Sequence, residues 1–191
     1  MLDRILEWDR ETLIYLNSLG IEEYDLFWST VTNIYTWVPL FVFFFFLIFS
    51  KFPKKEAIYT ALTIIVLIIF ILVATDLTKE YFGRLRPNNN VEINSLIRVL
   101  KNPSSFSFFS GHASSSFSIT TLMVLFLRKK AKWCWVFYIW PILFSLSRIY
   151  VGVHYPVDII VGAIVGLITA LAFYKLYKKV ITPYLGLAHP G

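Results

Sequence analysis

The chain has 191 residues, of which 57% are hydrophobic and 16% charged, and its mean hydropathy is +0.65. This composition excludes an ordinary soluble domain and indicates a single domain, residues 1–191, embedded in a membrane. The net charge of +6 does not indicate nucleic-acid binding, because the basic residues form short clusters between apolar segments. Cys134 is the only cysteine, which excludes a disulfide framework. Three histidines and one cysteine supply no metal-ligand cluster, so we expect no metal and no cofactor.

Residues 1–20 predict an amphipathic helix and not a secretory signal. Charged residues interrupt any apolar core in this segment, while Leu2, Ile5, Leu6, Leu13 and Leu16 recur at roughly helical spacing. Two interpretations remain open at this point. The helix either lies in the membrane interface or packs as a cap on the end of a helical bundle.

Five apolar segments follow that are long enough, or nearly long enough, to cross a membrane. They cover about residues 26–50, 57–75, 112–128, 133–150 and 156–175. The sequence therefore predicts an all-α integral membrane bundle of about five transmembrane helices plus the N-terminal interfacial helix. The one long connection, 79–111, is rich in Asn and Ser, as is typical of a loop.

The distribution of charge predicts the orientation of this bundle. Three connections hold ten of the 18 basic residues and only one of the 12 acidic ones, Glu56. By the positive-inside rule these connections are cytoplasmic. The 79–111 loop is then on the opposite, non-cytoplasmic side. The basic residues concerned are Lys51, Lys54 and Lys55, then Arg128, Lys129, Lys130 and Lys132, then Lys175, Lys178 and Lys179.

Three polar clusters at the ends of apolar segments carry the chemistry. Together they supply three cations, two imidazoles and a carboxylate, which suit phosphoryl transfer without a metal. The cations bind an anionic phosphoryl group, one imidazole attacks phosphorus and the other protonates the departing oxygen. The clusters are Lys79 with Arg86-Pro87; Ser110-Gly111-His112; and Ser147-Arg148 with Gly152, His154 and Asp158.

The spacing within each cluster gives local expectations. Two helical turns separate Lys79 from Arg86, so a helix running through both would project the two cations from one face; alternatively, they snorkel at a helix end. Arg84 between them is either a fourth phosphate contact or a solvated charge.

Ser110 fits a helix N-cap, and Gly111 lets an anion approach the helix N-terminus; the alternative is a plain cap followed by a solvated histidine. Asp158, four residues after His154, either accepts its ring N–H or only favours the helix start.

The three clusters, in this order and spacing, resemble the motifs of the type 2 phosphatidic acid phosphatase superfamily, which also includes vanadium haloperoxidases. The third motif is complete, whereas Phe109 stands where the second has proline. The resemblance implies that His154 attacks phosphorus to give a phosphohistidine and that His112 protonates the leaving group. It also implies that Lys79, Arg86 and Arg148, with amides near Ser110 and Gly111, hold the phosphate oxygens.

The predicted function is a membrane lipid phosphatase that hydrolyses a phosphomonoester or diphosphate. The candidate lipids are phosphatidic acid, phosphatidylglycerophosphate, undecaprenyl diphosphate and lipid A phosphates. Two alternatives remain: a vanadate-binding haloperoxidase-like enzyme, and a non-catalytic phosphate-binding membrane protein. The compact length favours a bacterial inner-membrane enzyme with a periplasmic site. Gly162 and Gly166 form a Gly-x-x-x-Gly pattern, explained either by close packing within the bundle or by a homodimer.

Overall fold

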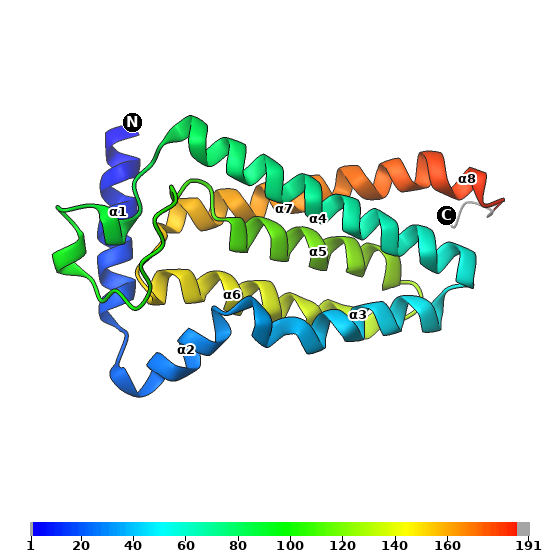
Figure 1. Ribbon diagram of the computed structural model, residues 1–191, viewed down its shortest axis with the longest axis horizontal. Coiled ribbons are helices and arrows are strands. Elements are labelled where there is room, and N and C mark those ends of the chain that lie inside the picture. Colours follow the sequence, from blue (N-terminus) through cyan, green and yellow to red (C-terminus); the bar gives the residue numbers. More distant parts are fainter. Residues whose placement is uncertain (1, 187–191) are drawn as a thin grey trace.

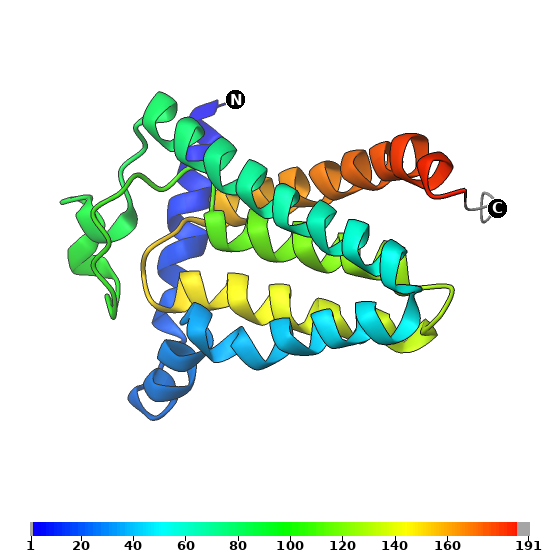
Figure 2. The same ribbon diagram turned by 45° about the vertical axis from the view of Figure 1, so that its right-hand side comes forward.

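The computed structural model describes residues 2–186, and within them the chain forms helices joined by turns and irregular loops, without a β-strand. Helices α3 (Val38–Lys51), α4 (Lys54–Phe82), α5 (Gly111–Leu127), α6 (Ile139–Tyr150) and α7 (Pro156–Leu176) run side by side along the long axis (Figure 1). Helix α1 (Leu2–Ser18) stands across one end of this bundle in both views (Figures 1 and 2). The short helices α2 (Asp25–Val31) and α8 (Thr182–Tyr184) lie at opposite ends.

The predicted segments correspond to these helices with two corrections. The segment predicted over 26–50 is not continuous, because a turn at Thr32 and Asn33 separates α2 from the 3₁₀ turn Ile34–Trp37 that leads into α3. The Asn33 side chain accepts the Tyr35 N–H, a local bond that ends one helix and starts the next. The segment predicted over 133–150 begins as a 3₁₀ turn, Lys132–Tyr138, before α6.

Three helical stretches are long and apolar enough to cross a membrane: Ile34–Lys51, Lys54–Asn89 and Pro156–Tyr184. Helix α5 is also apolar but has 17 residues, and α6 has 12. The chain is therefore an integral membrane protein with transmembrane helices.

Helix α5 occupies the centre of the bundle, where most of its side chains are buried against α4, α6 and α7. The closest approach is to α7. A Cβ atom on Gly166 would lie 2.5 Å from the carbonyl oxygen of Ser114, and one on Gly162 would lie 2.7 Å from that of Ser110. These two glycines therefore serve packing within one chain. The expectation of a homodimer through Gly162 and Gly166 is wrong, because α5 already covers that face.

Helix α1 packs on the end of the bundle through its buried face. The amide of Asn17 donates to the carbonyls of Ile149, Tyr150 and Arg98 at 3.0–3.1 Å, and its oxygen accepts the Arg98 N–H at 2.7 Å. One buried side chain thus ties α1 to the C-terminus of α6 and to the long loop. The cap interpretation of the N-terminal helix is confirmed.

Replacing Gly166 by valine is expected to destabilise the protein by about 1–3 kcal/mol, because the added side chain must push α7 away from α5. Thermal unfolding of the detergent-solubilised protein measures this as a lower midpoint. Ile168→Val on the exposed face of the same helix is the control. An unchanged midpoint for Gly166→Val would contradict the packing described here.

Candidate active site

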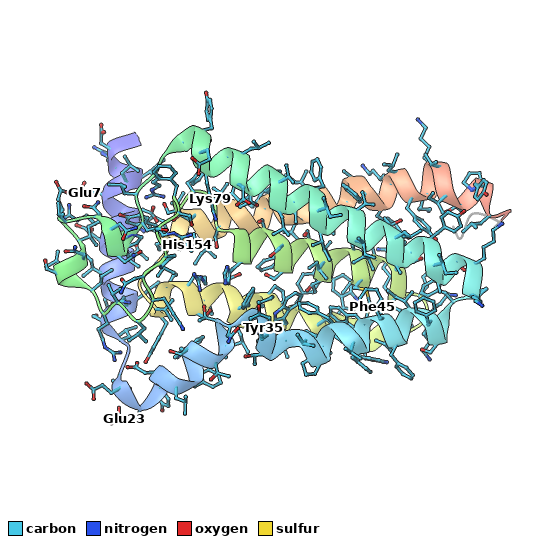
Figure 3. All side chains as sticks on the ribbon, in the orientation of Figure 1. Glu7, Glu23, Tyr35, Phe45, Lys79 and His154 are labelled. Carbon is cyan, nitrogen blue, oxygen red and sulfur yellow. The ribbon has the colours of Figure 1, made fainter. Side chains whose placement is uncertain are left out.

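The three polar clusters meet at the end of the bundle that α1 crosses. Figure 3 shows Lys79 and His154 close together there, with Phe45 further along the bundle on α3. The cations Arg86, Arg148 and Lys79 are near enough to His154 that their charges lower its pKa. Residues separated by up to 75 positions in the sequence thus form one site.

Arg86 reaches the site from a loop and not from a helix. Helix α4 ends at Phe82, where Gly83 adopts a left-handed conformation with φ of 56° that terminates the helix. The expectation that one helix carries both Lys79 and Arg86 is wrong, and the loop predicted over 79–111 begins at Gly83. The Arg86 guanidinium is buried and fixed by donated bonds to the carbonyls of Ser105 (2.6 Å) and Val153 (3.0 Å).

His154 lies in the turn between α6 and α7 and is 1% exposed. Its Nδ1 is 3.3 Å from Asp158 Oδ2, and its Nε2 is 2.9 Å from Arg86 Nη1. Because a guanidinium only donates, Nε2 is the acceptor and the proton is on Nδ1, directed at the carboxylate. The predicted contact between Asp158 and His154 is confirmed.

Burial lowers the pKa of His154 well below its usual value, and the charges of Arg86, Arg148 and Lys79 lower it further. The imidazole is therefore neutral at neutral pH, and its Nε2 lone pair accepts a hydrogen bond from Arg86. A neutral imidazole oriented by a carboxylate is the form that a nitrogen nucleophile requires.

Arg148 on α6 and His112 on α5 both line the site. The Arg148 side chain is buried; its Nη1 donates to the Thr32 hydroxyl, while its Nε has no partner among residues 2–186. The His112 ring stacks on Phe144 with a centroid separation of 4.5 Å. A buried, unpartnered guanidinium N–H is a donor available to bind an anion.

At the start of α5, Ser110 caps the helix and Gly111 lines the cavity. The Ser110 hydroxyl accepts the Ala113 N–H as an N-cap, and its own N–H donates to the Asp158 carbonyl at 2.9 Å. The Ser110 amide is thus already engaged, and Gly111 is the residue that lines the cavity beside Lys79. The buried side chain of Phe109, where the motif has proline, packs just before this cap.

Arg84 is neither a phosphate contact nor a solvated charge, so both expectations for it are wrong. Its Nη1 donates to Asp158 Oδ1 at 2.6 Å and its Nη2 to Asp9 Oδ2 at 2.7 Å. The sequence interpretation missed Asp9 altogether. The sequence held one signal, because Asp9 lies one turn before the apolar Leu13 on the same helix face. In the structure Asp9, Leu13 and Asn17 are all buried.

A cavity of about 900 Å³ extends from this site into the bundle. Its polar end is lined by Lys79, Gly111, His112 and Arg148, together with Lys101 from the loop. Its other end is apolar and lies between α3, α4 and α5, where Phe44, Ile64 and Met123 are among the lining residues. The shape suits an amphipathic molecule with an anionic head and a hydrocarbon tail. Fold and site together define a phosphatase embedded in a membrane.

Comparison with known proteins identifies the family. Residues 60–182 match the PAP2 superfamily. The chain is 29% identical over its whole length to the lipid A 4′-phosphatase of Porphyromonas gingivalis, of which it covers 81%. Over 74% of its length it is 32% identical to an undecaprenyl-diphosphatase of Sulfolobus acidocaldarius, of which it covers 63%.

Two solved structures share the fold. A transmembrane PAP2 type phosphatidylglycerolphosphate phosphatase from Bacillus subtilis superposes with a TM-score of 0.74 at 19% identity, over 93% of this chain and 88% of that one. Aquifex aeolicus LpxE gives 0.67 at 25% identity, over 86% and 93%.

The chain belongs to the PAP2 superfamily. It is a lipid phosphatase, a hydrolase of phosphoric monoesters or diphosphates, as the sequence predicts.

The lowered pKa of His154 predicts the acid limb of the activity profile. The pH dependence of kcat/KM reports the pKa values of the free enzyme. We therefore expect kcat/KM to fall only at a pH below the pKa of an ordinary histidine, which is about 6.5. The acid limb shifts to lower pH because a lowered pKa keeps the imidazole unprotonated at lower pH. The measurement uses an aryl phosphate, with the ionisation of the substrate titrated separately. An acid limb at or above about 6.5 would contradict the assignment.

Proposed function

We propose that the chain hydrolyses a lipid phosphate through a phosphohistidine on His154. The observation that carries the proposal is the position of this imidazole. Its Nδ1 faces the Asp158 carboxylate, and its Nε2 lies next to Arg86 in a cluster of cations that includes an unpartnered guanidinium N–H on Arg148. A phosphoryl group bound there would place phosphorus next to the nitrogen lone pair.

In the first step the Nε2 lone pair forms a bond to phosphorus, and the bond from phosphorus to the ester oxygen breaks. The electron pair of that bond goes to the leaving oxygen, which takes a proton from His112. Lys79, Arg86 and Arg148, with the Gly111 end of α5, hold the other phosphate oxygens. Arg86 Nη1 exchanges its contact with Nε2 for one with a phosphate oxygen.

In the second step a water oxygen bonds to phosphorus and the bond to Nε2 breaks. The electron pair returns to the imidazole, the proton of the water passes to His112, and inorganic phosphate leaves. Both histidines are then restored to their starting protonation states. Binding of phosphate alone would require the cations but not two histidines, so the pair favours catalysis over a non-catalytic binding protein.

The apolar part of the cavity supports a substrate with long hydrocarbon chains. Two of the relatives, which align with 100% and 94% of this chain, are lipid A 4′-phosphatases. The undecaprenyl-diphosphatase of Sulfolobus acidocaldarius aligns with 74%. We therefore rank a lipid A phosphomonoester first among the candidate substrates and undecaprenyl diphosphate second, ahead of phosphatidic acid and phosphatidylglycerophosphate.

We further propose that residues 1–191 form one domain of five transmembrane helices, α3 to α7, in a bacterial inner membrane. The proposal is supported by the basic clusters, which lie at the end of the bundle opposite α1; by the positive-inside rule that end is cytoplasmic and the site periplasmic. Trp8 and Tyr15 of α1, and Leu19 just after it, are exposed, as suits a helix that caps the bundle and also contacts the membrane interface.

The division of labour between the two histidines is testable with two leaving groups. Loss of the general acid should cost about 10²–10⁴-fold on an alkyl phosphate, whose alkoxide leaves poorly without a proton. A nitrophenyl phosphate leaves readily without help. His112→Ala should therefore regain part of its activity on nitrophenyl phosphate, whereas His154→Ala should be inactive on both substrates.

If nitrophenyl phosphate restores activity to His154→Ala and not to His112→Ala, the roles of the two histidines are reversed. Equal losses for both variants on both substrates would refute separate roles altogether. Ser50→Ala, at the opposite end of the bundle, is the control for expression and purification in detergent.

A further inference from the structure

Arg84 joins two buried carboxylates that come from opposite ends of the sequence. Asp9 on α1 and Asp158 in the first turn of α7 are both 0% exposed, and Arg84 donates to each of them. The Arg84 backbone is held as well, because its carbonyl accepts the Ser107 N–H at 2.8 Å. The guanidinium also lies over the Tyr155 ring, 4.0 Å from its centroid. Arg84 is therefore fixed on several sides.

Both carboxylates have the environment of ionised groups. Asp9 accepts the Val157 N–H on Oδ1 at 2.7 Å and Arg84 on Oδ2. Asp158 accepts Arg84 on Oδ1, and its Oδ2 accepts the Tyr155 N–H at 3.0 Å and faces His154 Nδ1. Burial raises the pKa of Asp9, and the bonds from Arg84 and Val157 oppose that shift. Every carboxylate oxygen of the two acids accepts at least one donor, and these bonds favour the ionised form of both.

The charge of this network is one unit negative, since two carboxylates surround one guanidinium. Neutral His154 adds no charge to it. When phosphorus bonds to Nε2 while Nδ1 keeps its proton, the imidazole becomes cationic and the network with the ring becomes neutral. Without Asp9, Arg84 would cancel the charge of Asp158, and the cationic ring would face a group of no net charge. Electrostatic stabilisation of this kind is strong where water is excluded.

The geometry points to Arg84 and Asp9 as positioning residues that extend the contact between His154 and Asp158. Arg84 fixes the Asp158 carboxylate, and Asp9 supplies the excess negative charge that stabilises the cationic ring of phosphorylated His154. This inference rests on the proposed role of His154 as the nucleophile. It also makes α1 part of the catalytic apparatus as well as a cap.

The test compares two inhibitors of nitrophenyl phosphate hydrolysis in the Asp9→Asn variant. Orthovanadate forms a bond to Nε2 and so makes the ring cationic, whereas inorganic phosphate binds only to the cations. We expect the inhibition constant for vanadate to rise and kcat to fall by about 10–100-fold, the size of effect typical when the hydrogen-bond partner of a metal-ligating histidine is removed. The inhibition constant for phosphate and the KM should not change.

Arg10→Gln is the matched control. Arg10 is the next residue on α1 and also ties this helix to the long loop, through Glu92 at 3.3 Å, but it does not contact Asp158 or Arg84. Its loss should leave both inhibition constants and kcat unchanged. If Asp9→Asn behaves like Arg10→Gln, or raises both inhibition constants equally, the inference is wrong.

Arg84→Lys tests the same idea should Asp9→Asn not fold. An ammonium lacks the planar fork that spans both acids, so vanadate affinity should again fall while phosphate affinity is kept. A wild-type constant for vanadate in Arg84→Lys would overturn the inference. The His154→Gln variant separates this inference from the proposed function. If the proposed function is wrong, His154→Gln keeps its turnover and its inhibition by vanadate. If only this inference is wrong, His154→Gln is inactive.

Discussion

The structure depends on two buried guanidinium groups that have no carboxylate partner among residues 2–186. Arg86 donates to carbonyls, to Ser105 and to His154, and Arg148 donates to Thr32. Burying like charges next to one another is costly unless a counter-charge compensates them. In the proposed function a phosphate group supplies that counter-charge. The free energy that holding these cations costs the fold would then be recovered when the anion binds.

The rest of the bundle holds these charges in place. Helix α5 packs so closely on α7 that two glycines are required, and this contact brings the start of α5 against Asp158. Helix α1 also holds the site in place, because Asn17 bonds to the end of α6 and Asp9 accepts a bond from Arg84. Rigid elements that carry charges in a fixed arrangement need no reorganisation when charge develops in the reaction. In the proposed function the apolar cavity between α3, α4 and α5 holds the tail of the substrate.

Local sequence rules predicted the parts of the fold that depend on local physics. The apolar segments, the N-cap at Ser110, the proline start of α7 and the contact four residues apart between His154 and Asp158 all follow from helix geometry. The end of α4 was also readable, because Gly83 can adopt the left-handed conformation that closes a helix. The prediction of one helix through Lys79 and Arg86 did not take Gly83 into account.

What could not be predicted is set by contacts between distant residues. The partners of Arg84 are 74 and 75 positions away, and Thr32 meets Arg148 across 116 positions. No periodicity or motif spacing encodes such pairs. Asp9 could be predicted only in part. Its place on the buried face of α1 marks it as unusual, but its partner becomes evident only once α1 lies across the end of the bundle.

The most direct test of the account is to trap the covalent intermediate. The enzyme is mixed with a phosphate-radiolabelled lipid, denatured in alkali within the first turnover, and digested to locate the label. The account predicts label on the peptide that contains His154, stable in alkali and lost in acid, and no label on the His154→Gln variant. Label on His112, or full turnover by the His154→Gln variant, would contradict it.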